Sequence, residues 1–171
     1  MHNHFELFGL APAFALETDA LERSYREIQS RVHPDRFAHA GDAERRASLQ
    51  WTTRVNEAYR TLKDPVQRAK HLLELQGVDV AFETDTAMPS GFLVQQMELR
   101  ESLEDAVERK DASALDAFRT NLRKQRQSLE QAIAEAIDAN KDYTGAAGLV
   151  RKLQFLDKLD TEIDAAYETI E

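Results

Sequence analysis

The sequence predicts an all-α protein, and three observations support this prediction. Long segments repeat apolar side chains every three or four residues, which is the period of an α-helix. The 4 prolines and 6 glycines fall at the ends of these segments rather than in their middles. No segment alternates apolar and polar residues for long enough to indicate a sheet.

The first half of the chain contains two long predicted helices and a short one. In residues 19–32 the repeated apolar side chains are Leu21, Tyr25, Ile28 and Val32. In residues 43–63 they are Trp51, Val55, Ala58 and Leu62. Asp64 followed by Pro65 is an N-cap with a first-turn proline, which predicts the start of the short helix.

The second half contains three more predicted helices, near residues 91–109, 112–139 and 146–170. Residues 77–90 are mixed in composition and rich in turn formers, so we place a domain boundary there. The sequence therefore predicts a first domain over 1–76, a linker over 77–90 and a three-helix domain over 91–171.

Composition excludes several classes of protein. The 171 residues contain no cysteine, which excludes disulfides, a catalytic thiol and thiolate-bound metal. The net charge is −9, and in each half of the chain Asp and Glu outnumber Lys and Arg. Because neither half is basic, we expect no binding to nucleic acid. No apolar run approaches a membrane span, and no signal peptide precedes residue 10. We therefore expect a cytoplasmic protein that binds no membrane.

The tripeptide His33-Pro34-Asp35 is the most informative motif. It follows one amphipathic helix directly and precedes a second long helix within a short loop. Pro34 ends the first helix and fixes the backbone, which presents the imidazole and the carboxylate in a set direction. Opposite the apolar stripe of that helix lie three arginines, and a fourth follows in the loop: Arg23, Arg26, Arg31 and Arg36.

These residues resemble a known family. The segment from Phe5 to Gly77 resembles a J-domain, with a short helix in residues 5–10 and the His-Pro-Asp loop between two antiparallel helices. The whole chain resembles the HscB family, the J-protein co-chaperones of bacterial iron–sulfur cluster assembly. Residues 4–10 (HFELFGL), 92–101 and 150–159 (VRKLQFLDKL) carry this closer match.

The resemblance implies that the first domain docks on a specialised DnaK-class chaperone ATPase, of the HscA type, and stimulates its ATP hydrolysis. The implied contacts are His33, Pro34 and Asp35 with the basic side of the preceding helix. An arginine-bearing face suits an acidic partner surface, and a fixed carboxylate suits a partner cation. No glycine-rich phosphate loop is present in the chain, so we expect it to bind no nucleotide itself.

Two other interpretations of the loop stay open. His33 and Asp35 could do no more than close a helix–helix turn. A metal site built from His33, Asp35 and His39 is conceivable from residue type, although no further ligand lies nearby in sequence. His2 and His4 lie near the N-terminus, where we expect no role.

The helix beginning near Gly91 carries apolar residues on two sides. Phe92, Leu99, Leu103 and Ala106 form one stripe of the width expected for a core contact. Leu93, Val94 and Met97 lie away from that stripe, among the carboxylates of Glu98, Glu101, Glu104 and Asp105. From geometry alone this second side is equally consistent with an exposed binding surface and with packing against the first domain.

The resemblance favours the binding surface. In HscB proteins this helix binds IscU, the scaffold on which the cluster is built. The matching positions are Leu93, Val94, Met97, Glu98, Arg100, Glu101 and Asp105, with Phe155 from the last helix. Eukaryotic relatives add an N-terminal extension with paired cysteines, whereas this chain has none, so we expect no metal or other cofactor.

The resemblance thus implies an L-shaped, two-domain, all-helical adaptor that is not an enzyme. Three alternatives compete with it. A general J-protein would bind many denatured chains rather than one folded partner. A metal-dependent hydrolase centred on His33, Asp35 and His39 would hold metal and turn over alone. A purely structural bundle would leave the His-Pro-Asp loop without a role.

Overall fold

The computed structural model describes residues 3–80 and 90–171, and every regular element in them is helical. The chain divides into two compact units, Met1–Gly77 and Val78–Glu171. The predicted linker over 77–90 falls mostly on residues 81–89, which lie outside the described residues. The all-α prediction is confirmed. No helix of the described chain is long and apolar enough to span a membrane.

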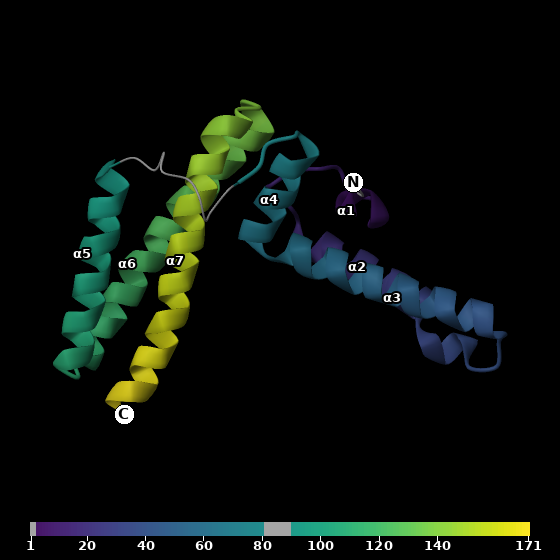
Figure 1. The fold of residues 1–171 in the computed structure, drawn as a ribbon, viewed down its shortest axis with the longest axis horizontal. Helices are drawn as coiled ribbons and strands as arrows, with labels where there is room; N and C mark the ends of the chain where they lie inside the picture. Colours follow the sequence, from purple (N-terminus) through teal and green to yellow (C-terminus); the bar gives the residue numbers. More distant parts are fainter. Residues whose placement is uncertain (1–2, 81–89) are drawn as a thin grey trace. The chain divides into compact units, whose positions relative to one another are not determined.

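The first unit contains a short α1 (His4–Leu7), the long helices α2 (Thr18–Val32) and α3 (Asp42–Lys63), and α4 (Pro65–Leu75). A single 3-10 turn, η1 (Pro34–Phe37), lies between α2 and α3. Figure 1 shows α2 and α3 side by side with this turn at one end of the pair. Tyr25 links the two helices: its ring stacks on Tyr59 at 4.0 Å and its hydroxyl donates to Asn56 at 2.7 Å.

The core of the first unit comes from all four helices. Phe5, Leu21, Val55, Leu62 and Leu73 are at most 1% exposed. The predicted cap of α4 is confirmed, because the Asp64 carboxylate accepts a hydrogen bond from the Val66 N–H at 2.9 Å. This cap fixes the sharp turn from α3 into α4.

Two expectations for the first unit are wrong. The apolar period predicts a buried Trp51 in the stripe of α3, yet Trp51 is 44% exposed with the Arg54 guanidinium 5.2 Å from its ring. Ser48 is buried instead, and its hydroxyl satisfies the Val32 carbonyl at the end of α2. His4 is not an idle terminal residue, because its ring stacks on the buried His71 at 4.4 Å.

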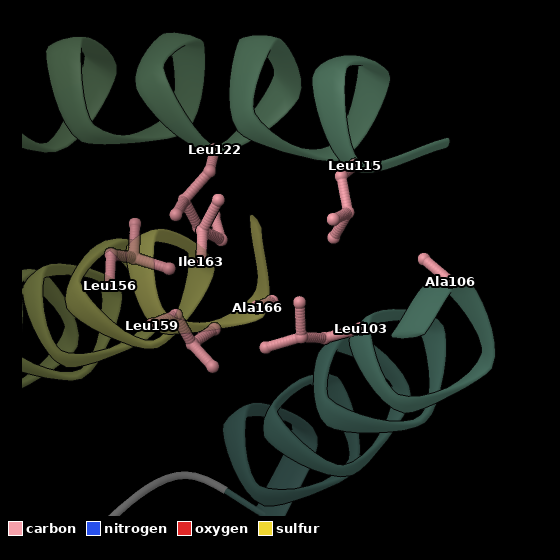
Figure 2. Packing of buried hydrophobic residues seen from close by; sticks show 8 residues of the cluster. All are labelled: Leu103, Ala106, Leu115, Leu122, Leu156, Leu159, Ile163 and Ala166. Carbon is pink, nitrogen blue, oxygen red and sulfur yellow. The ribbon is translucent and has the colours of Figure 1, made fainter. Parts of the chain in front are cut away.

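The second unit is a bundle of α5 (Ser90–Glu108), α6 (Ala112–Ala134) and α7 (Tyr143–Ile170). Its core is a cluster of aliphatic side chains from all three helices (Figure 2), namely Leu103, Ala106, Leu115, Leu122, Leu156, Leu159, Ile163 and Ala166. The predicted core stripe of α5 is therefore confirmed: Phe92, Leu103 and Ala106 are buried and Leu99 is partly buried.

The turn from α6 to α7 differs from the prediction in two ways. The end of the predicted helix over 112–139 is a π-helical segment, η2 (Glu135–Ala139). The last helix begins at Tyr143 rather than near 146, because the Asp142 carboxylate caps it by accepting from the Gly145 N–H at 3.0 Å. Gly145 therefore lies in the first turn of α7, where its N–H is bound by the cap, and not in a break.

Candidate functional site

The His33-Pro34-Asp35 loop begins where α2 ends. Pro34 has no N–H to continue the helix, and its ring disfavours helical backbone at the preceding residue. His33 accordingly adopts φ −57° and ψ 134°, and Pro34 then starts the 3-10 turn. The prediction that this proline ends the first long helix is confirmed.

The side chains of His33 and Asp35 face each other across this turn. The Nδ1 of His33 accepts a hydrogen bond from the Asp35 N–H at 3.2 Å and lies 3.6 Å from its carboxylate. Because Nδ1 accepts, the proton of the neutral ring is on Nε2. The Asp35 side chain is 93% exposed, so its carboxylate is available to a cation on a partner.

Arg36 ties the loop back to α2. Its backbone N–H donates to the His33 carbonyl at 3.0 Å, and its guanidinium donates to the Ser30 carbonyl at 3.3 Å. The second bond satisfies one of the carbonyls that a helix end leaves without a partner. Arg36 is therefore an exposed cation that also helps to hold the loop in place.

The three predicted arginines of α2 are all exposed. Arg26 lies 3.9 Å from Glu22, and Arg31 lies 2.5 Å from Glu27. Exposed pairs of this kind contribute little free energy, so an acidic partner can compete for both cations. The four arginines and the His-Pro-Asp loop therefore all lie on the exposed surface of the first unit.

The interpretation of His33, Asp35 and His39 as a metal site receives no support from the geometry. Within residues 3–80 and 90–171, no group of three His, Cys, Asp or Glu side chains is placed to share one ion. The geometry therefore gives no support to a metal-dependent hydrolase centred on these three residues.

The second set of predicted residues lies on α5. Five large apolar side chains are exposed in the described part of the chain, and three of them are on this helix. Leu93 is 51% exposed, Val94 is 54% exposed and Met97 is 64% exposed. Glu98, Glu101 and Asp105 are exposed on the same helix. We call these six residues the α5 face. Their exposure favours a binding surface over core packing.

Arg100 and Phe155 lie beside this face, where α5 meets α7. Arg100 binds both carboxylate oxygens of Glu162, at 2.9 and 3.2 Å, and its guanidinium lies 5.5 Å from the Phe155 ring. Phe155 also makes an edge contact with the buried Phe92, with ring centroids 5.8 Å apart. Phe155 is half-buried, so it offers only part of its ring to a partner.

Sequence reasoning missed Glu162, the residue that fixes Arg100. The two residues are 62 positions apart, and nothing in the local pattern of α7 marks this glutamate as different from its neighbours. Sequence reasoning also missed the exposed pair Leu49 and Trp51 on α3, which are 55% and 44% exposed. Their exposure could not be inferred, because the spacing of Trp51 fits the buried stripe.

Comparisons with known proteins agree along the whole chain. The family model of the HSCB C-terminal oligomerisation domain matches residues 88–164. Co-chaperone protein HscB homologs of Burkholderia mallei (strain SAVP1) and Burkholderia multivorans (strain ATCC 17616 / 249) are 49% and 47% identical, over 99% of this chain and 96% of each relative.

Solved structures give the same result. Chaperone HscB from Vibrio cholerae superposes with a TM-score of 0.87 at 36% identity, covering 99% of this chain and 100% of that one. Human co-chaperone protein HscB gives 0.91 at 26% identity, covering 96% of this chain and 82% of that one. Jac1 co-chaperone from Saccharomyces cerevisiae, at 20% identity and a TM-score of 0.77, shares the fold.

Proposed function

The chain belongs to the HscB family of J-domain co-chaperones, and from this premise we propose that it couples two partners during maturation of iron–sulfur proteins. One partner is a DnaK-class chaperone ATPase of the HscA type, whose ATP hydrolysis the first unit stimulates. The other is an iron–sulfur scaffold protein of the IscU type, which the second unit binds and delivers. In this proposal the chain holds no cofactor, catalyses no reaction of its own and works in the cytoplasm.

The observation that carries the proposal is the α5 face. Leu93, Val94 and Met97 lie half to two-thirds exposed on one regular helix, among carboxylates. A fixed apolar patch with acidic neighbours fits one folded partner that has a complementary apolar patch and basic residues. Binding of many denatured chains calls for an adaptable surface, which a rigid helix flanked by charge does not offer.

The exposed loop of the first unit supports the chaperone half of the proposal. The Asp35 carboxylate is almost fully exposed on a backbone that Pro34 constrains. The His33 ring stabilises this turn by accepting a hydrogen bond from the Asp35 N–H. Little entropy is then lost when a cation of the chaperone pairs with the carboxylate. The exposed arginines of α2 attract an acidic surface and speed the encounter.

Joining the two surfaces in one chain supplies the mechanism. When the scaffold is bound to the second unit, its concentration near the chaperone is set by the length of the chain rather than by bulk solution. Stimulated hydrolysis then occurs while the scaffold is at hand, which couples the use of ATP to delivery.

The steady-state ATPase rate of the cognate chaperone tests this function, measured with and without scaffold. We expect the native chain and scaffold to stimulate together, and His33→Gln to remove all stimulation. The variant Leu93→Ala/Met97→Ala/Phe155→Ala should lose only the scaffold-dependent part. Full activity of the triple variant would show that the α5 face does not bind the scaffold, and full activity of His33→Gln would overturn the proposal.

A further inference from the structure

A groove of about 360 Å³ lies between the C-terminal halves of α5 and α7. Its apolar lining comes from Leu103 and Val107 on α5 and from Ala165 and Ala166 on α7. The two alanines are too small to fill the space opposite the larger side chains of α5, and an unfilled apolar groove forgoes packing that a partner could supply.

The rim of this groove is acidic. Glu104, Glu108 and Glu162 line it. Arg100 neutralises Glu162, whereas Glu104 and Glu108 are exposed and form no ion pair within the described residues. Two uncompensated carboxylates beside apolar side chains favour a ligand that carries both cations and aliphatic groups.

The groove is continuous with the α5 face. At about 100° per residue, Glu104 lies on α5 between the groove-lining Val107 and the exposed Met97. Glu108 lies on the same side of the helix as Met97 and Glu101, about two to three turns further along. The Arg100–Glu162 pair, 2.9 Å apart, bridges α5 and α7 where the groove begins: Glu162 lines the groove, and Arg100 lies one turn before Glu104. A protein seated on the α5 face would therefore reach the groove without leaving the surface of α5.

We propose that the groove is a second part of the scaffold-binding surface and that it takes a basic, aliphatic segment of the folded scaffold. Aliphatic side chains of that segment pack on Leu103, Val107 and Ala165, and its lysine or arginine groups pair with Glu104 and Glu108. This inference rests on the proposed function. Stable interfaces bury about 800 Å² on each partner, which is more than three exposed apolar side chains supply, so an extension of the face is expected.

A second groove in the same unit has basic and not acidic residues at its rim. It has a volume of about 320 Å³, an apolar lining of Phe92, Leu129 and Leu156, and lysines at its rim, Lys124 and Lys152. A basic segment would be repelled there. Charge, and not apolar area alone, therefore selects the groove between α5 and α7.

Calorimetric titration of the full-length chain with purified scaffold tests the proposal. We expect Glu104→Lys, Glu108→Lys and the groove-filling Ala165→Trp each to weaken binding about tenfold. Glu135→Lys and Ala117→Trp make the same chemical changes at exposed positions on η2 and α6 and should bind as the native chain does. Added salt should weaken the native complex more than that of Glu104→Lys.

The outcomes separate this inference from the function on which it rests. If the three groove variants bind like the native chain while Leu93→Ala/Met97→Ala binds weakly, the groove is not part of the interface and the proposed function is unaffected. If Leu93→Ala/Met97→Ala also binds like the native chain, the α5 face is not the interface, and both its proposed role as the scaffold-binding surface and this inference are wrong.

Discussion

The two units present their proposed surfaces in opposite ways. In the first, His33 and Asp35 lie in a break between helices, and Pro34 dictates the backbone that holds them. In the second, Leu93 and Met97 lie along an uninterrupted helix and differ from the core residues of α5 only in the side they face. A loop motif is thus recognised by the identity of its residues, whereas a helix face is recognised by apolar residues in excess of what the core needs.

The units also differ in how they respond to acid. All 5 histidines of the chain lie before residue 72, and one of them, His71, is 4% exposed in the core of the first unit. The second unit contains no histidine. A change of pH between neutrality and the range of carboxylate titration should therefore act on one unit only.

The largest expected effect is at the loop. We expect Asp35→Asn to remove stimulation of the chaperone ATPase, because the side chain loses the charge that pairs with a cation. Scaffold affinity, measured by titration, should not change. Glu44→Gln removes an exposed carboxylate from the first turn of α3 and serves as the control. Equal loss in both variants would mean that overall charge matters and the loop does not.

The next effect is on the α5 face. We expect Leu93→Ala/Met97→Ala to weaken scaffold binding about a hundredfold, because two apolar anchors are truncated. Stability to urea should change by less than about 0.5 kcal/mol, since both side chains are exposed. Leu49→Ala, at a similarly exposed leucine of α3, should leave scaffold binding intact. A large loss of stability in the double variant would show that these residues are core.

Acid should destabilise the first unit selectively. Burial, with a smaller contribution from the charge of His4, lowers the pKa of His71 from 6.5 to about 4. The unfolded chain therefore takes up a proton below pH 6.5 that the folded chain resists, and stability falls as the pH falls. From about pH 7 to about pH 4.5 we expect a loss of about 2 kcal/mol from this residue.

Fluorescence of Trp51, the single tryptophan, reports this loss from within the first unit. His71→Gln keeps an acceptor for the His4 N–H, which now donates to His71 Nε2 at 3.1 Å, and should flatten the pH dependence. His39→Gln changes an exposed histidine and should leave the pH dependence of stability as it is in the native chain. A pH dependence that survives in His71→Gln would assign it to other groups.

The smallest expected effect is at Arg100. We expect Arg100→Lys to weaken scaffold binding about threefold, because the lysine ammonium lacks the planar guanidinium that lies 5.5 Å from the Phe155 ring and so positions Phe155 less firmly. Arg109→Lys, at an exposed arginine just beyond α5, is the matched control. A loss of scaffold affinity as large as that of Leu93→Ala/Met97→Ala would instead indicate that Arg100 contacts the scaffold directly.

Much of the fold follows from the sequence because helices depend on local signals. The apolar period of α2, the proline at its end and the Asp64 cap of α4 are each readable within a few residues, and each is confirmed. The predicted start of α7 near residue 146 is too late because Gly145 resembles a break in the sequence, whereas the Asp142 carboxylate caps the helix at the Gly145 N–H.

Features that depend on distant contacts could not be predicted. Trp51 fits the spacing of the buried stripe of α3, but Ser48 takes the buried position because its hydroxyl reaches the end of α2. The groove between α5 and α7 is lined by Leu103 from one helix and Ala165 from the other, and the Arg100–Glu162 pair joins helices far apart in sequence. Only a folded chain reveals such pairings.

One chain must carry both surfaces if the scaffold is to reach the chaperone by tethering, and mixing two full-length variants tests this directly. Asp35→Asn should still bind scaffold, and Leu93→Ala/Met97→Ala should still engage the chaperone. We predict that an equal mixture fails to restore scaffold-dependent ATPase stimulation, since neither chain links the two partners. Restoration to the native rate would contradict tethering and show that the two units act independently.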